Sequence, residues 1–150
     1  MPRRCRSSSP FASSKASPFR RGWIVHDGWI PTRKSTLMQG DGGDGKTPLV
    51  QQLQSSCATA LPWIGLRVEE CVSIGFYIED EEQHLKERQA AIDAAYSQHC
   101  ASTGNLHLFP RPDEENELVV FDRTGKPSIT PFYHQVREAA LGRVDTYRDP

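Results

Sequence analysis

The chain from residue 22 onward alternates between two hydrophobic periods. Residues 36–39 form a short apolar-leaning run that stops at Gly40, and from Lys46 the apolar positions step at helical spacing. This pattern predicts a strand, a glycine-rich turn and a helix. Residues 72–78 alternate in the period of a half-buried strand, and residues 85–96 place their apolar positions on one helical face. A second strand and a second helix are therefore expected.

Weaker patterns follow in the C-terminal third of the chain. Residues 106–109 and 118–121 predict two more strands, and residues 132–140 predict a last helix. Strands that alternate with helices indicate an α/β fold with a mainly parallel sheet flanked by helices.

Size and composition limit the possible classes of protein. A chain of 150 residues with 37% hydrophobic residues is about the size of one domain. No apolar run approaches the 18 or more residues of a membrane span, and no secretory segment is present. We expect a soluble, cytoplasmic protein without a membrane partner. The four cysteines are too far apart for a CxxC zinc or redox pair, which favours reduced and mostly buried thiols.

Charge is unevenly distributed along the chain. The total of 18 Lys and Arg against 19 Asp and Glu gives a net charge of -1. Residues 1–21, however, hold six basic residues, six serines, three prolines and no acid, so the remainder carries about −7. We interpret this segment as a disordered basic arm, with a transit peptide or a phosphate-contacting tail as alternatives.

The chemistry of the chain is concentrated between the first predicted strand and helix. Residues 40–47 match G-x-x-x-x-G-K-[ST] at every fixed position, in the strand–loop–helix context that a P-loop requires. Glycines let backbone N–H groups form an anion nest, and the helix adds its positive end. Lys46 supplies a charge for the β- and γ-phosphates, and the Thr47 hydroxyl suits Mg²⁺. The predicted nucleotide-binding residues are Gly40, Asp41, Gly42, Gly43, Asp44, Gly45, Lys46 and Thr47.

Two residues are unusual for such a loop. Asp44 places a carboxylate inside a cradle for anions, which costs affinity unless it points to solvent or helps to hold the metal. Pro48 lies in the first helical turn, where a missing N–H is tolerated, but one phosphate hydrogen bond is then lost.

An acidic cluster, residues 79–82, follows the second predicted strand. Ligands of open α/β sheets bind at the carboxyl ends of the strands, so this cluster is expected at the same edge as the P-loop. Glu79, which ends the strand, is the expected catalytic carboxylate that positions or deprotonates the attacking water. For Glu81 and Glu82 we prefer a simple role in the first turn of the following helix, where the dipole favours acids.

Several segments taken together resemble a known family. They are residues 29–31 (WIP), the loop 40–47, residues 57–65 (CATALPWIG) and residues 76–81 (FYIEDE). This combination resembles the RecA-like AAA-type ATPases related to the RepA hexameric replicative helicases of plasmids, over about residues 22–140. The resemblance implies a RecA-like core, ATP with Mg²⁺, a ring-shaped homo-oligomer and single-stranded DNA as a partner. It also implies Lys46 and Thr47 as phosphate and magnesium residues and Glu79 as the catalytic glutamate.

The family pattern includes one further strand that ends in a metal-shell aspartate, the Walker B carboxylate. Asp122 follows an apolar run, but residues 123–126 behind it are typical of a tight turn, which is the preferred interpretation. We therefore expect an incomplete core: a basic arm at 1–21, a partial RecA-like ATP-binding domain at 22–141 and a tail at 142–150.

The function expected from the sequence is ATP binding, with hydrolysis coupled to DNA replication or unwinding in complete relatives. The alternative is a truncated, non-hydrolysing nucleotide-binding or interaction module. A small-molecule kinase is a third possibility, for which the sequence shows no substrate pocket.

Overall fold

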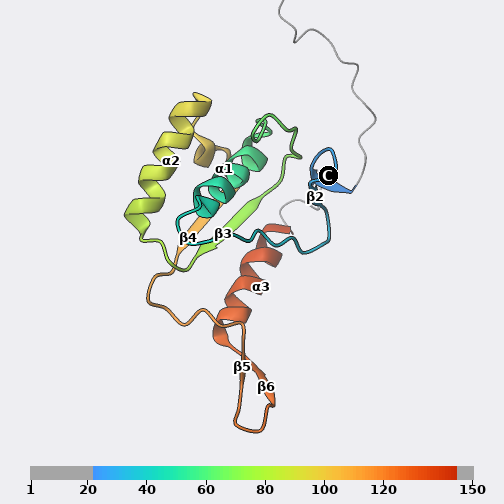
Figure 1. The fold of residues 1–150 in the computed structure, drawn as a ribbon, viewed down its shortest axis with the longest axis vertical. Helices are drawn as coiled ribbons and strands as arrows, with labels where there is room; N and C mark the ends of the chain where they lie inside the picture. Colours follow the sequence, from blue (N-terminus) through green and yellow to red (C-terminus); the bar gives the residue numbers. More distant parts are fainter. Residues whose placement is uncertain (1–21, 145–150) are drawn as a thin grey trace, which may run out of the picture.

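The computed structural model describes residues 22–144, which form an α/β body and a projecting arm (Figure 1). Within them the helices are α1 (Lys46–Thr59), α2 (Glu82–Tyr96) and α3 (Pro131–Val144), with a 3-10 turn η1 (Cys100–Thr103). The strands are β1 (Trp23–Val25), β2 (Ile30–Pro31), β3 (Ser73–Tyr77), β4 (Leu106–Pro110), β5 (Val119–Phe121) and β6 (Pro127–Ile129). The predicted helices and the strands at 72–78, 106–109 and 118–121 are thus confirmed.

The sheet is smaller than expected. β3 and β4 pair in parallel with Ser73 opposite Leu106 and Tyr77 opposite Pro110, whereas β1–β2 and β5–β6 are antiparallel pairs. A parallel sheet flanked by helices is thus present among residues 22–144, but it contains one strand pair, so the complete sheet of a RecA-like core is not seen there. The arrangement of a parallel pair covered by helices still fits a P-loop-like α/β fold.

The strand expected at residues 36–39 does not form. Residues 35–41 have no regular structure, and Leu37 is 85% exposed. A run of apolar residues becomes a strand only when its backbone groups pair with a neighbour, and β3 pairs with β4 alone. The segment is therefore an irregular approach to the loop at 40–47.

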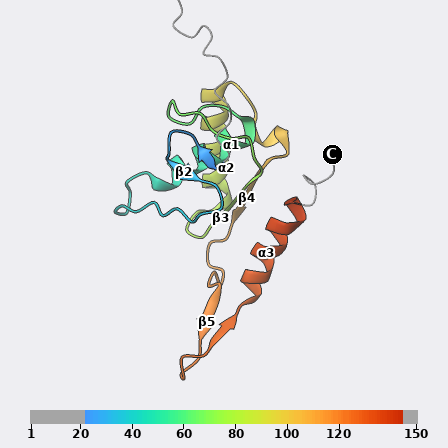
Figure 2. The same ribbon diagram turned by 90° about the vertical axis from the view of Figure 1, so that its right-hand side faces the viewer.

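The C-terminal arm consists of the β5–β6 hairpin, which points away from the body, and α3, which runs back from the hairpin toward it (Figure 2). Phe132 connects this arm to the body. Its ring packs edge-on against Phe76, with the ring centroids 5.5 Å apart, and the Arg111 guanidinium lies 4.2 Å from its ring centroid. α3 continues to Val144, beyond residue 140, where the predicted helix ends.

The core lies where α1, η1 and β4 meet. Ala58, Cys100 and Leu106 are buried together, and side chains of α2 pack against them. Among the described cysteines, Cys57 and Cys100 are buried, Cys71 is half-buried, and all are unpaired thiols, as expected. Cys5 lies outside the described residues. Within residues 22–144, no helix combines the length and apolar character needed to cross a membrane.

The face of α1 toward α2 is polar. Gln51 and Ser55 are both 0% exposed, and the Gln51 amide donates to the Leu85 carbonyl at 3.0 Å and to Gln89 Oε1 at 3.1 Å. The Gln89 amide donates in turn to Ser55 Oγ at 3.0 Å. These bonds satisfy the buried Gln51 amide N–H groups and the Ser55 hydroxyl, whereas the buried Gln51 Oε1 has no hydrogen-bond partner within residues 22–144.

On its other side, α1 approaches β3 closely at Gly75. A Cβ atom at this position would lie 2.6 Å from Gln54 Nε2 and 2.7 Å from Tyr77 Cε2, so any residue larger than glycine would require one of these side chains to move. The Tyr77 hydroxyl donates to Gln54 Oε1 at 2.5 Å, which fixes the amide in this place. Burial raises the pKa of Tyr77 to about 12, so the donor is present at neutral pH.

We expect Gly75→Ala to lower the free energy of unfolding by about 1–3 kcal/mol, because the added methyl group forces Gln54 or Tyr77 to move. Gly142→Ala is the matched control, since a Cβ there meets nothing within 4 Å and alanine favours a helix. Urea unfolding measures both variants. Equal stability of Gly75→Ala and the parent would contradict the close packing of α1 on β3.

Candidate functional site

The loop at residues 40–47 turns directly into α1. Gly43 and Gly45 have φ angles of 85° and 77°, in the left-handed region that favours glycine. α1 begins at Lys46, so the first backbone amides of the helix, which have no acceptor within it, lie at the end of the loop. A helix N-terminus that follows a glycine-rich loop is suited to an oxyanion.

The positive end of α1 lacks an anionic partner among residues 22–144. Its first turn contains no acidic residue, and no side chain caps it. α2, in contrast, has Glu82 in its first turn. Because the helix dipole favours negative charge at this end, the start of α1 is electrostatically prepared for a phosphate.

The Lys46 ammonium folds back over the loop. It donates to the Gly40 carbonyl at 2.8 Å and to the Asp41 carbonyl. These are neutral acceptors, which form weaker bonds with an ammonium than phosphate oxygens do. We therefore expect the Lys46 ammonium to exchange these carbonyls for phosphate oxygens when a nucleotide binds.

A cavity of about 310 Å³ joins this loop to the carboxyl end of β3. Lys46 and Thr47 line it from α1, and Glu79 and Asp80 line it from the segment after β3. The loop and the acidic cluster after β3 therefore lie at the same edge of the sheet, as expected. The remaining lining residues are Met38, Val50, Phe76, Tyr77 and Ile78.

The carboxylates that follow β3 differ in their partners. Asp80 forms an ion pair with Arg88 at 2.5 Å, and Glu82 forms one with Lys86 at 2.6 Å. Glu79 is exposed and has no ion pair within residues 22–144. Glu79 is therefore the carboxylate at the cavity that is available to a water molecule or a ligand.

Sequence analysis did not assign Met38, Tyr77 or Asp80 to the site, although all three line the cavity. Asp80 belongs to the acidic cluster at residues 79–82. Its ion pair with Arg88 forms because α2, which begins at Glu82, carries Arg88. Met38 carried no chemical signal, since its place in the cavity follows from the irregular path of residues 35–41.

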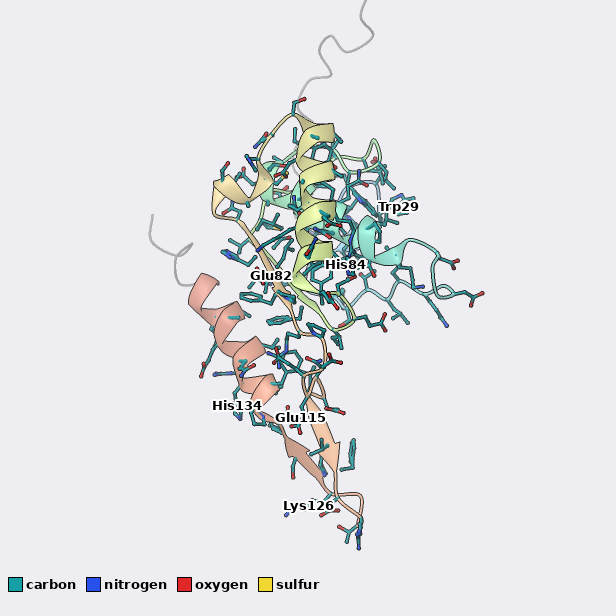
Figure 3. All side chains as sticks on the ribbon, turned by 90° about the vertical axis from the view of Figure 1, so that its left-hand side faces the viewer. Trp29, Glu82, His84, Glu115, Lys126 and His134 are labelled. Atoms are coloured by element: carbon teal, nitrogen blue, oxygen red, sulfur yellow. The ribbon has the colours of Figure 1, made fainter. Side chains whose placement is uncertain are left out.

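Asp122 lies in the turn of the β5–β6 hairpin. Its Oδ1 accepts from the Thr124 hydroxyl at 2.6 Å, the Thr124 amide at 2.8 Å and the Lys126 amide at 3.0 Å. These bonds, led by the one from the Thr124 hydroxyl, hold the pKa of Asp122 below its usual value. Figure 3 shows Lys126 at the tip of the hairpin, far from Glu82 and His84 at the start of α2. The turn interpretation of Asp122 is therefore confirmed.

Two of the segments that carried the family resemblance meet beside α1. Trp29, after β1, packs edge-on against Trp63 with ring centroids 6.4 Å apart. Trp63 is 2% exposed, and its indole Nε1 donates to the Leu49 carbonyl of α1 at 3.1 Å. Trp63 thus contacts α1 directly, and Trp29 packs behind it.

A larger cavity of about 630 Å³ lies in the arm, between the loop after β4, the hairpin and α3. Glu114, Glu115 and Glu117 line it, and their charge disfavours a phosphate. Arg111 is there as well, but its guanidinium already binds Asn116, Gln135 and Glu114. The smaller cavity at the loop is therefore the better site for an anionic ligand.

A family model described as an AAA domain matches residues 1–147. The chain belongs to the AAA domain family. No curated protein and no solved structure matches it. The membership makes the chain a nucleotide-binding AAA-type domain, and AAA domains in general depend on ATP and Mg²⁺.

The residues at the cavity of this AAA domain fit those cofactors. The positive-φ glycines and the uncapped start of α1 suit phosphates, and the Thr47 hydroxyl suits Mg²⁺. No group of three or more His, Cys, Asp or Glu within residues 22–144 could hold a metal ion. Since Mg²⁺ takes several ligands from water and phosphate oxygens, Thr47 needs few protein partners to hold it with a nucleotide.

We expect Asp122→Ala to leave MgATP affinity unchanged, because its carboxylate binds the hairpin backbone and does not line the cavity. Isothermal titration calorimetry measures the affinity, and amide hydrogen exchange at Thr124 and Lys126 should increase as a control for the lost turn bonds. Loss of MgATP binding in this variant would return Asp122 to the role of a metal-shell carboxylate.

Proposed function

We propose that this AAA domain binds ATP with Mg²⁺ in the loop at 40–47 and hydrolyses it with Glu79 as the catalytic glutamate. The observation that carries the proposal is the cavity that Lys46 and Thr47 share with Glu79. Phosphate-binding groups and a carboxylate that line one cavity are what phosphoryl transfer to water requires.

In the proposed complex the phosphates lie against the loop amides and the start of α1. The Lys46 ammonium leaves the carbonyls of Gly40 and Asp41 for the β- and γ-phosphates, where its bonds are charge-assisted. The Thr47 hydroxyl contributes to the Mg²⁺ shell. The metal supplies charge stabilisation for the phosphates when bound.

Glu79 acts on the water. Its carboxylate is exposed at the cavity, whereas the neighbouring Asp80 is neutralised by Arg88. A carboxylate can accept the proton of a water that attacks the γ-phosphate, provided that no cation already occupies its oxygens. In this protein Glu79 meets that condition better than Asp80.

The wider role that we propose is that of a RepA-like replicative helicase domain, acting as a ring-shaped homo-oligomer on single-stranded DNA. It is supported by the shared segments around Trp29, Trp63 and Glu79. The basic residues of 1–21, which lie outside the described part of the chain, suit the DNA backbone and would give binding a salt dependence.

A non-hydrolysing nucleotide-binding module is the second candidate. It is favoured by the position of Asp122 in the hairpin turn, since residues 22–144 then give the cavity no carboxylate from a strand next to β3 to complete a metal shell. In that case nucleotide is a structural ligand and Glu79 has no chemical role.

We expect Lys46→Ala to weaken MgATP binding by about 1.5–3 kcal/mol, the range for hydrogen bonds to charged groups. Lys86→Ala is the control, because this lysine is 73% exposed and pairs with Glu82 on α2. Calorimetric titration of both variants measures the difference. Equal affinity in Lys46→Ala and the parent would show that the loop does not hold the phosphates.

We expect Glu79→Gln to retain MgATP affinity and to abolish phosphate release, because the amide has the shape of the carboxylate but is a poor base. Glu81→Gln, at the N-cap of α2, is the control and should hydrolyse normally. A phosphate-release assay decides between the two candidates. Turnover in Glu79→Gln would exclude the catalytic role, and a parent that binds MgATP without turnover would favour the non-hydrolysing module.

A further inference from the structure

The Asp44 carboxylate folds back onto its own loop. Its Oδ2 accepts from the Asp41 amide at 2.7 Å, and the Asp44 amide donates to the Asp41 carbonyl at 3.4 Å. The same oxygen lies where a Cβ at Gly40 would meet it at 2.9 Å. The carboxylate is therefore hydrogen-bonded to the turn that begins the loop, at an exposed position.

The side chains of Lys46 and Asp44 are bound to the same short stretch of loop backbone. Lys46 holds the carbonyls of Gly40 and Asp41, while Asp44 holds the Asp41 amide. An oxyanion on a loop amide has the chemistry of a phosphate on a P-loop. The loop thus carries an anion of its own next to the place where a nucleotide brings several negative charges.

We propose that Asp44 is an internal competitor of the nucleotide's phosphates and sets the affinity of this site. The proposal rests on the proposed function, since it concerns the same loop. Phosphates that enter the loop meet a carboxylate of like charge, which they displace or tolerate at a cost in free energy. The cost increases with the number of phosphates, so Asp44 discriminates against highly charged nucleotides.

The test compares full-length parent, Asp44→Ala and Asp44→Asn in calorimetric titrations with MgATP, ATP without metal, and AMP. Asp41→Asn is the matched control, because it removes the same charge from the same loop without removing the contact with the Asp41 amide. We expect Asp44→Ala to bind MgATP roughly 3- to 10-fold more tightly than the parent at low salt. The gain should be smaller for AMP and should shrink at high salt, which a purely structural role would not produce.

Asp44→Asn keeps an oxygen that can accept from the Asp41 amide, so it preserves the loop if the alanine variant is unstable. Asp44→Asn should also bind MgATP more tightly than the parent. Unchanged affinity in both Asp44 variants, with a parent that binds MgATP, would overturn the inference and leave the proposed function intact. An equal gain in Asp41→Asn would also overturn it, since net loop charge would then be the cause.

Weaker MgATP binding in the Asp44 variants, with metal-free ATP unaffected, would overturn the inference in favour of a metal-binding role for Asp44. Absence of ATP binding in the parent and in every variant would contradict the proposed function itself. The two failures are therefore distinguishable in one set of titrations.

Discussion

The close approach of α1 to β3 at Gly75 is the contact on which the site depends. One wall of the cavity comes from the start of α1 and the other from the end of β3, so any separation of the two elements would part Lys46 from Glu79. The hydrogen bond between Tyr77 and Gln54 fixes the position of the helix along the strand. The small size of Gly75, in the middle of β3, thus allows the packing that brings Lys46 and Glu79 to one cavity.

The rest of the body holds α1 from its remaining sides. Gln51 and Ser55 connect it to α2 through buried polar bonds, and Trp63 holds the carbonyl of Leu49 near its first turn. A helix fixed in this way presents a stationary N-terminus. Rearrangement on nucleotide binding is then expected in the loop side chains, where Lys46 is held by exposed, neutral contacts.

Local sequence patterns predicted the parts of this protein that local interactions determine. The glycines and Lys46 of the loop, the helix behind it and the strand before Glu79 follow from spacing. The turn at Asp122 follows from the turn chemistry of residues 123–126. The strand at 36–39 was wrong because strand formation requires a partner, which local sequence does not specify. The burial of Gln51 could not be predicted either, since apolar periodicity identifies one buried face and α1 is covered on two sides.

We propose that nucleotide binds at the junction of the loop and β3, and not in the larger cavity of the arm. Amide chemical-shift mapping of the isotope-labelled chain during a titration with MgATP tests this placement. We predict the largest shifts at Gly43, Gly45, Thr47 and Glu79, with the amides around Arg111 and Gln135 unchanged. Shifts centred on Arg111 and Gln135, with the loop unaffected, would contradict it.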